Sequence, residues 1–151
     1  MKNLLKYFKL VKKFIKLSLN DKSLILKVVI ITAISRWQML NVSFEKLQKK
    51  LGRYNDESYY NILEVEEINY LRKIRWAVTS VANNTPWESK CLVKAMTIQS
   101  ILHRKGMETT LYLGINKDNN ILVAHSWIRC GNLYITGGDG TGYAVVAKFT
   151  K

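Results

Sequence analysis

The hydrophobic pattern changes its period at Gly106, and this change constrains the fold more than any other feature of the sequence. Before Gly106, apolar residues recur every three or four positions, which is typical of helices that bury one face. After Gly106, apolar and polar residues alternate, which is typical of strands with one buried face. The chain is therefore expected to form about five helices, followed by an antiparallel meander of about four strands. Helices segregated from an antiparallel sheet make an α+β fold.

Capping residues, glycines and one proline separate the expected elements. The predicted helices cover residues 2–19, 21–39, 44–51, 65–82 and 89–105, and the predicted strands cover residues 109–116, 121–129, 133–136 and 143–149. Asn20 or Asp21 is the expected N-cap of the second helix, Ser43 of the third and Ser89 of the fifth. Residues 53–61 are expected to form a loop.

Positive charge is concentrated in the first third of the chain. Residues 1–50 contain twelve Lys or Arg residues against only Asp21 and Glu45. Lysines occupy one face of the first helix, which indicates a docking helix with a solvated lysine face, or contact with a membrane surface or an acidic partner. No nucleic-acid-binding module is recognisable. We therefore distinguish a basic helical region, residues 1–60, from a core, residues 61–151.

The sequence predicts a cytoplasmic location. Lysines interrupt the first twenty residues, so no clean apolar signal segment is evident. The longest apolar stretch, residues 24–34, contains Lys27 and is shorter than the roughly 18–20 residues that cross a bilayer. Two cysteines give no disulfide framework, which suits a reducing compartment.

Cys91 is the first candidate for chemistry. With Ser89 as the N-cap, this cysteine falls in the first turn of the fifth helix, where unbonded N–H groups and the positive end of the helix dipole favour a thiolate. Lys90 adds a neighbouring positive charge. A thiolate can attack a carbonyl carbon. The alternative is that Cys91 is a small buried apolar residue.

A thiolate catalyst needs a base, and the chain offers two histidines. His103 lies twelve residues after Cys91 on the same helix, which is too far along the axis. His125 lies within a predicted strand, on the same face as Val123 and Trp127. If the fifth helix packs on that face, Cys91 and His125 meet; otherwise His125 is a structural residue.

The group that would orient the imidazole is found by elimination. After Asp118 the chain has one carboxylate, Asp139. A turn of two or three residues places His125 opposite Gly137 or Gly138, next to Asp139. Asp139 is therefore either the third catalytic residue or an ordinary turn residue.

The other motifs predict no cofactor and no metal. Cys130 lies at a hairpin turn away from any helix start, so it is expected to be incidental. Two histidines and two cysteines without ligand spacing do not form a metal site. The segment "GGDGTG" precedes a strand and not a helix, and therefore does not form a phosphate loop.

Two blocks of sequence carry a resemblance to a known family. "WAVTSVANNTPWESKCLVKAMTIQSILHRKGMETTLYLGI", followed by "AHSWIRCGNLYITGG" and "YAVVAKF", resembles the transglutaminase-like cysteine peptidases of lasso-peptide biosynthesis, which are leader peptidases known as the B component. The resemblance covers about residues 70–151 and, more loosely, the first 60 residues. It implies a papain-like constellation on a transglutaminase-like core, with Cys91 as nucleophile and His125 as general base and acid. Because "ITGG" precedes Asp139, either Asp139 or a Cys–His dyad fits the resemblance.

The resemblance also implies a function and partners. The implied function is removal of the leader from a ribosomally made lasso precursor, before a separate cyclase closes the macrolactam ring. Because the N-terminal region reads as helices, a separate leader-recognition protein is expected. Trp87 and Trp127 would either wall the substrate groove or fill the core. The alternatives are a non-catalytic scaffold that presents the leader, acyl transfer to an amine through the same acyl-enzyme, or a basic binding protein without peptidase activity.

Overall fold

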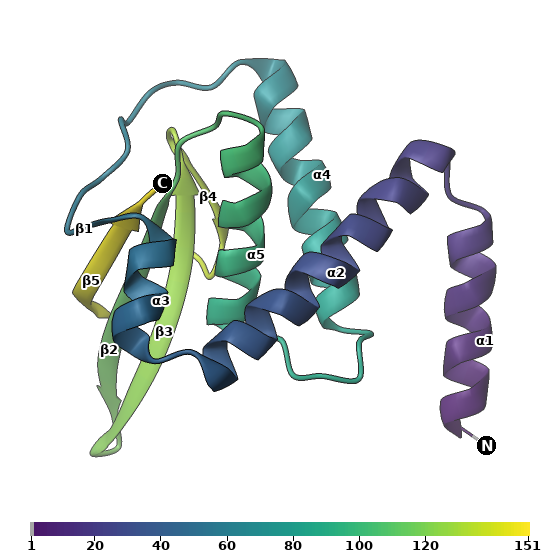
Figure 1. Ribbon diagram of the computed structural model, residues 1–151, viewed down its shortest axis with the longest axis horizontal. Coiled ribbons are helices and arrows are strands. Elements are labelled where there is room, and N and C mark those ends of the chain that lie inside the picture. The colour runs from purple at the N-terminus through teal and green to yellow at the C-terminus, as the bar shows by residue number, and fades with distance from the viewer. Residues whose placement is uncertain (1) are drawn as a thin grey trace.

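The computed structural model describes residues 2–151, with the side chains of residue 8 and residues 10–151. It confirms the predicted α+β class: helices pack on one face of a five-stranded antiparallel sheet (Figure 1). The helices are α1 (Lys2–Ile15), α2 (Leu19–Asn41), α3 (Phe44–Leu51), α4 (Val65–Ala82) and α5 (Cys91–Arg104). The strands are β1 (Arg53–Tyr54), β2 (Thr110–Asp118), β3 (Ile121–Cys130), β4 (Leu133–Thr136) and β5 (Ala144–Thr150).

The start of α2 differs from the prediction. Its N-cap is Ser18, and neither Asn20 nor Asp21 serves as the cap. The Ser18 hydroxyl accepts a hydrogen bond from the Asp21 N–H at 3.1 Å and donates one to the Asp21 carboxylate at 2.7 Å. Asp21 therefore lies in the first turn, where the positive end of the helix favours a carboxylate. Ser43 is the N-cap of α3, as predicted.

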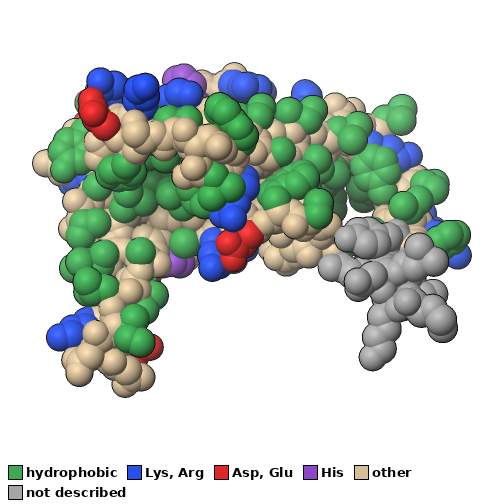
Figure 2. Space-filling model, turned by 60° about the horizontal axis from the view of Figure 1, so that its bottom comes forward, with side chains coloured by type: hydrophobic (Ala, Val, Ile, Leu, Met, Phe, Trp, Pro, Cys, Tyr) green, Lys and Arg blue, Asp and Glu red, His purple; other side chains and the backbone are tan. Residues whose placement is uncertain are grey.

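The helix α2 is long and apolar enough to cross a membrane, by its length and composition. The sequence-based expectation considered only residues 24–34, which are too few to span a bilayer, and missed this property of the whole helix. Here α2 packs with one side against α4 and α5, and a single helix of this kind carries no conclusion about location. Hydrophobic side chains nevertheless reach the surface over the helical part of the molecule (Figure 2).

The sheet is not a simple meander. Its strand order is β1-β5-β2-β3-β4, so β5 crosses from β4 to pair with β2. This pairing places Phe149 beside Leu111 and Ala147 beside Leu113, which brings β5 into the packed part of the sheet. The loop after β4 can make the crossing because four of its glycines have positive φ. The expected loop at 53–61 also contains β1, which pairs with the end of β5.

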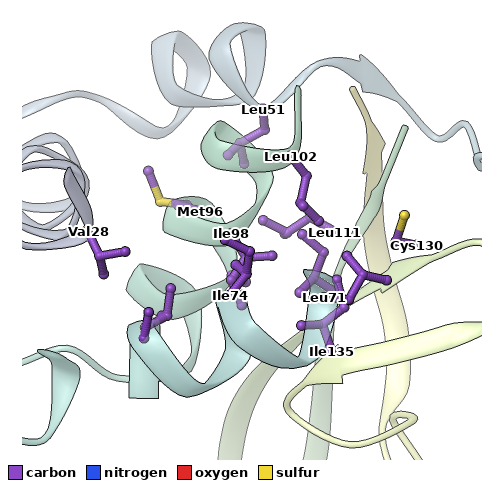
Figure 3. Packing of buried hydrophobic residues seen from close by; sticks show 14 of the residues in the cluster. Val28, Leu51, Leu71, Ile74, Met96, Ile98, Leu102, Leu111, Cys130 and Ile135 are labelled. Atoms are coloured by element: carbon purple, nitrogen blue, oxygen red, sulfur yellow. The ribbon is translucent and has the colours of Figure 1, made fainter. Parts of the chain in front are cut away.

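One hydrophobic core joins the helices to the sheet (Figure 3). Ile98 and Leu102 of α5 pack with Leu111 of β2 and Ile128 of β3. Val28 of α2 belongs to the same cluster, as do Leu47 and Leu51 of α3. The basic helical region thus shares the core of the rest of the chain, and the boundary at residue 60 stays a prediction.

The two faces of the sheet are packed differently. The face opposite the helices carries Arg129, which is 2% exposed. Its guanidinium donates hydrogen bonds to Tyr112 Oη at 3.1 Å, the Ser58 carbonyl at 2.9 Å and the Gly131 carbonyl at 2.6 Å. These bonds hold the segment after β1 against the outer face, so β3 is covered on both sides along its second half.

Candidate active site

Cys91 is the first residue of α5 and is half-buried. The N-cap is Lys90, whose backbone is extended (φ −73°, ψ −173°) and whose side chain makes no cap hydrogen bond. The prediction of Ser89 as N-cap is wrong, because Ser89 lies one residue too early. Its buried hydroxyl has no hydrogen-bond partner in the part of the chain that the structure describes. The first N–H groups of α5 therefore have no capping side chain and can bind an anion at Cys91.

Charged residues surround the start of α5. Lys90 Nζ lies 2.9 Å from the Glu88 carboxylate, and Arg36 of α2 lies 3.4 Å from the same side chain. The hydrogen bond from Lys90 is the main reason that the pKa of Glu88 is lowered. The positive charge that the sequence places beside Cys91 is thus partly balanced by Glu88, and the ion pair with Arg36 ties the start of α5 to α2.

The His125 ring is held by a backbone carbonyl. Its Nε2 lies 2.8 Å from the Gly137 oxygen. Because a carbonyl oxygen only accepts, Nε2 must carry the proton, and Nδ1 is left as the basic nitrogen of the neutral ring. The ring also packs against Tyr143, with centroids 4.9 Å apart. The Gly137 carbonyl therefore orients the imidazole, which is the role that the sequence predicted for the Asp139 carboxylate.

Asp139 does not contact His125 in this structure. Its carboxylate accepts hydrogen bonds from the Thr141 N–H at 2.9 Å and the Thr141 hydroxyl at 2.7 Å. These two bonds lower the pKa of Asp139, which is exposed to solvent. The turn arithmetic correctly placed Gly137 near His125, but the glycine-rich loop directs Asp139 to its own turn. A catalytic role for Asp139 has no geometric support here.

The helix α5 and the His125 side chain lie on opposite faces of β3, whereas the predicted pairing of Cys91 with His125 assumed the same face. Residues on the helix-covered face of β3 are Ile128 and Cys130, and alternation along the strand places Ser126 with them. His125 and Trp127 project to the other face. Among the described residues no hydrogen bond joins Cys91 to His125. Their pairing remains a prediction.

His125 lies where β3 changes from exposed to buried. Residues 121–124 are exposed, His125 is half-buried, and residues 126–130 are buried. The strand β4 ends at Thr136, opposite Ile128, so His125 lies beyond the last paired residue of β4. It is therefore at the border between the covered part of the sheet and the projecting β2–β3 hairpin (Figure 1).

The two tryptophans differ in exposure. Trp127 is 2% exposed and stacks on Tyr112, with ring centroids 5.4 Å apart and planes within 8°. Gly114 and Gly140 make room for this ring, because a Cβ on either would collide with it. Trp127 thus occupies a packing position, not a groove wall. Trp87 is half-buried, and its buried ring N–H has no partner among the described residues.

Cys130 is buried, 3% exposed. Burial is the main reason that the pKa of its thiol rises to about 11, and the nearby Glu67 carboxylate adds to the shift. Cys130 is therefore protonated at neutral pH and shielded from a substrate. Of the two thiols, only Cys91 is both accessible and next to unpaired N–H groups.

Sequence reasoning missed Gly137 and Tyr143 as partners of His125. Every residue has a backbone carbonyl, so residue type does not show which one accepts a hydrogen bond. The turn length placed Gly137 opposite His125 but did not identify this bond. In the part of the chain that the structure describes, no three His, Cys, Asp or Glu residues gather closely enough to bind a metal ion.

Comparison with known families supports the transglutaminase-like core. The family model described as the transglutaminase-like superfamily matches residues 38–149. The matched segment includes Cys91 and His125, and it begins within α2, before the expected boundary at residue 60. No match was found among the curated proteins or the solved structures. The family model covers more than half of the chain, and the protein therefore belongs to the transglutaminase-like superfamily.

Proposed function

We propose that this protein is a cysteine peptidase that removes the leader from a ribosomally made lasso precursor peptide. The observation that carries the proposal is the position of Cys91, an accessible thiol at an uncapped helix N-terminus, in a chain of the transglutaminase-like superfamily. That superfamily contains cysteine peptidases. The lasso precursor as substrate rests on the resemblance of the Pro-Trp, Cys-Leu and His-Ser-Trp blocks to the leader peptidases of that pathway.

The proposed reaction starts when the Cys91 thiol gives its proton to Nδ1 of His125 and becomes a thiolate. It attacks the carbonyl carbon of the last leader residue, and the first N–H groups of α5 stabilise the oxyanion. The C–N bond then breaks as protonated His125 gives its Nδ1 proton to the departing core amine. Water attacks the thioester, His125 takes one of its protons, and the leader leaves as a carboxylic acid while the thiolate is regenerated.

The role of His125 requires its ring to reach Cys91 around the edge of β3. The hydrogen bond to Gly137 supports this role, because it keeps Nδ1 free and fixes the ring plane. Catalytic hydrogen bonds are often long or absent before substrate binds. Trp87 is the tryptophan that remains available to line the groove beside Cys91.

The partners and the location belong to the same proposal. A separate leader-recognition protein would deliver the precursor, and a lasso cyclase would use the amine that cleavage exposes. Both steps are expected in the cytoplasm, where the precursor is made. No cofactor enters the proposed chemistry.

A non-catalytic scaffold is the second candidate, and the separation of Asp139 from His125 favours it. The two candidates differ in one experiment. A lasso precursor is incubated with its recognition protein and this protein, and the products are weighed by mass spectrometry for wild type, Cys91→Ala and Cys130→Ala. Leader release by wild type and Cys130→Ala, but not by Cys91→Ala, is the expected result. Release that persists in Cys91→Ala, or no release by wild type with a bound leader, would overturn the peptidase.

A further inference from the structure

Two of the three buried residues of α2 are polar, and its exposed side is mainly apolar. Its buried residues include Thr32 and Ser35, whose hydroxyls lie 3.5 Å from the Thr97 hydroxyl of α5. The solvent-exposed side of the helix consists mainly of large apolar side chains. We call this set the apolar α2 face: Leu19 (82% exposed), Leu26 (56%), Ile30 (60%), Ile34 (48%), Trp37 (59%) and Leu40 (63%). A helix of an isolated soluble domain normally has the reverse pattern.

The helix α1 extends this surface. Its described apolar residues Phe8, Val11 and Ile15 are more than half exposed. A groove of about 520 Å³ lies between α1, α2 and α4, lined by Phe14, Ile25 and other residues. Hydrophobic side chains gather over the helical part of the molecule, with a few basic side chains among them (Figure 2).

The charge around the apolar α2 face is positive. Lys12 and Lys13 of α1, Lys16 just after α1 and Lys27 of α2 are exposed. The two acidic residues of the first fifty are both engaged by lysines: Asp21 lies 2.6 Å from Lys73, and Glu45 lies 3.5 Å from Lys49. Among the described side chains, no salt bridge joins Lys12, Lys13, Lys16 or Lys27 to a carboxylate.

We propose that the apolar α2 face and the lysines of α1 dock on the surface of a bilayer that contains anionic lipids. Apolar side chains with a tryptophan can enter the boundary between headgroups and acyl chains, while lysines bind the headgroups. Each lysine near such a surface strengthens binding to anionic headgroups. A second copy of the chain fits less well, because docking this face on itself would bring two positively charged surfaces together. The inference does not depend on peptidase activity.

The test is sedimentation of the full chain with vesicles of phosphatidylcholine, with and without phosphatidylglycerol, at low and high salt. The main variant combines Ile30→Ser and Trp37→Ser. The control combines Ile121→Ser and Leu122→Ser, which remove equally exposed apolar side chains (68% and 71%) from the far tip of the β2–β3 hairpin. A third variant replaces Lys12, Lys13 and Lys16 by Gln. Circular dichroism checks that every variant is folded.

Wild type is expected to sediment with phosphatidylglycerol vesicles, and less so at high salt. The α2 and lysine variants should each lose about a hundredfold in partitioning, because the first removes two large apolar side chains and the second removes three charges, whereas the hairpin variant should bind like wild type. Three results would overturn the proposal: no binding by wild type at low salt, unchanged binding by the folded α2 variant, or a concentration-dependent dimer that Trp37→Ser dissolves without any vesicle binding. Leader release in solution, measured in parallel, separates failure of this proposal from failure of the proposed function.

Discussion

The start of α5 and the end of β3 each present a cysteine, and the two environments are opposite. Cys91 is half-buried beside N–H groups that no side chain caps, with lysine and arginine nearby. Cys130 is buried among aliphatic side chains, and its pKa is raised to about 11. Both residues lie in the same small fold, so cysteine content alone says nothing about reactivity. The helix terminus and the solvent access decide which thiol can act.

The largest expected difference between these regions is chemical reactivity. Iodoacetamide should modify Cys91 in the folded protein, whereas Cys130 should react only after the core opens. Because global opening of a domain costs at least about 5 kcal/mol, the rates should differ by at least about 5,000-fold. Mass spectrometry of peptides after timed quenching measures both rates. Equal rates in the folded protein would contradict the contrast, and equal rates in denaturant provide the control.

Gly137 tests how tightly the loop after β4 packs against the buried half of β3. Its φ is +83°, and a Cβ there would collide with the Ser126 carbonyl and lie 2.7 Å from Trp127 Cβ. Gly137→Ala should therefore cost about 2–4 kcal/mol in the free energy of unfolding, measured by urea denaturation.

Gly138→Ala is the matched control for this prediction. Gly138 has a similar φ of +72° with open space around a Cβ, so its replacement should cost only the backbone strain, about 1 kcal/mol. A smaller loss for Gly137→Ala than for Gly138→Ala would show that the loop is not pressed against β3.

Serine substitution compares the two cysteines as structural residues. Cys130→Ser should lower the free energy of unfolding by about 1–3 kcal/mol, because a hydroxyl would be buried without a designed partner. Cys91→Ser should change it by less than about 0.5 kcal/mol, because that position can reach water. Thermal and urea unfolding of the two variants beside wild type measure the difference. Equal losses would mean that Cys91 is as much a core residue as Cys130.

The smallest expected effect is a dependence of stability on alkaline pH. The folded-state pKa of Cys130 is above its ordinary value, so below about pH 9 both states hold the proton and nothing changes. Between about pH 9 and 11 the unfolded state loses the proton first, and stability falls by at most about 1.4 kcal/mol per pH unit. The loss should be smaller in Cys130→Ala. Urea unfolding of both proteins at pH 8 and above, taken as a difference so that lysine and tyrosine titration cancels, measures it.

The sequence predicted well those features that depend on residues close together in the chain. The bounds of α4 and β4 agree with the prediction, because capping residues, proline and tight turns determine them. The position of Cys91 in the first turn of α5 was predicted too, although the cap is Lys90 and not Ser89. These features depend on contacts within a few residues.

The features that sequence reasoning did not predict depend on distant contacts. Pairing of β5 with β2 depends on which strand can bury Phe149, and no short pattern records that choice. The face on which α5 packs determines where His125 points, and alternation alone leaves both faces equivalent. The acceptor for His125 is a carbonyl, which every residue possesses, so a search for carboxylates led to Asp139 instead.

The buried Arg129 has a consequence for a chain with the proposed activity, which must leave its own backbone intact. The segment between β1 and α4 is long and lacks helix, so by its extended form it resembles a substrate. The Arg129 guanidinium binds the carbonyls of Ser58 and Tyr59, and Ser58 itself is buried. A peptide bond whose carbonyl is engaged in this way cannot enter a second molecule's groove. The same arginine that holds this segment against the outer face of the sheet would thereby protect a chain with the proposed activity from cleavage by another copy.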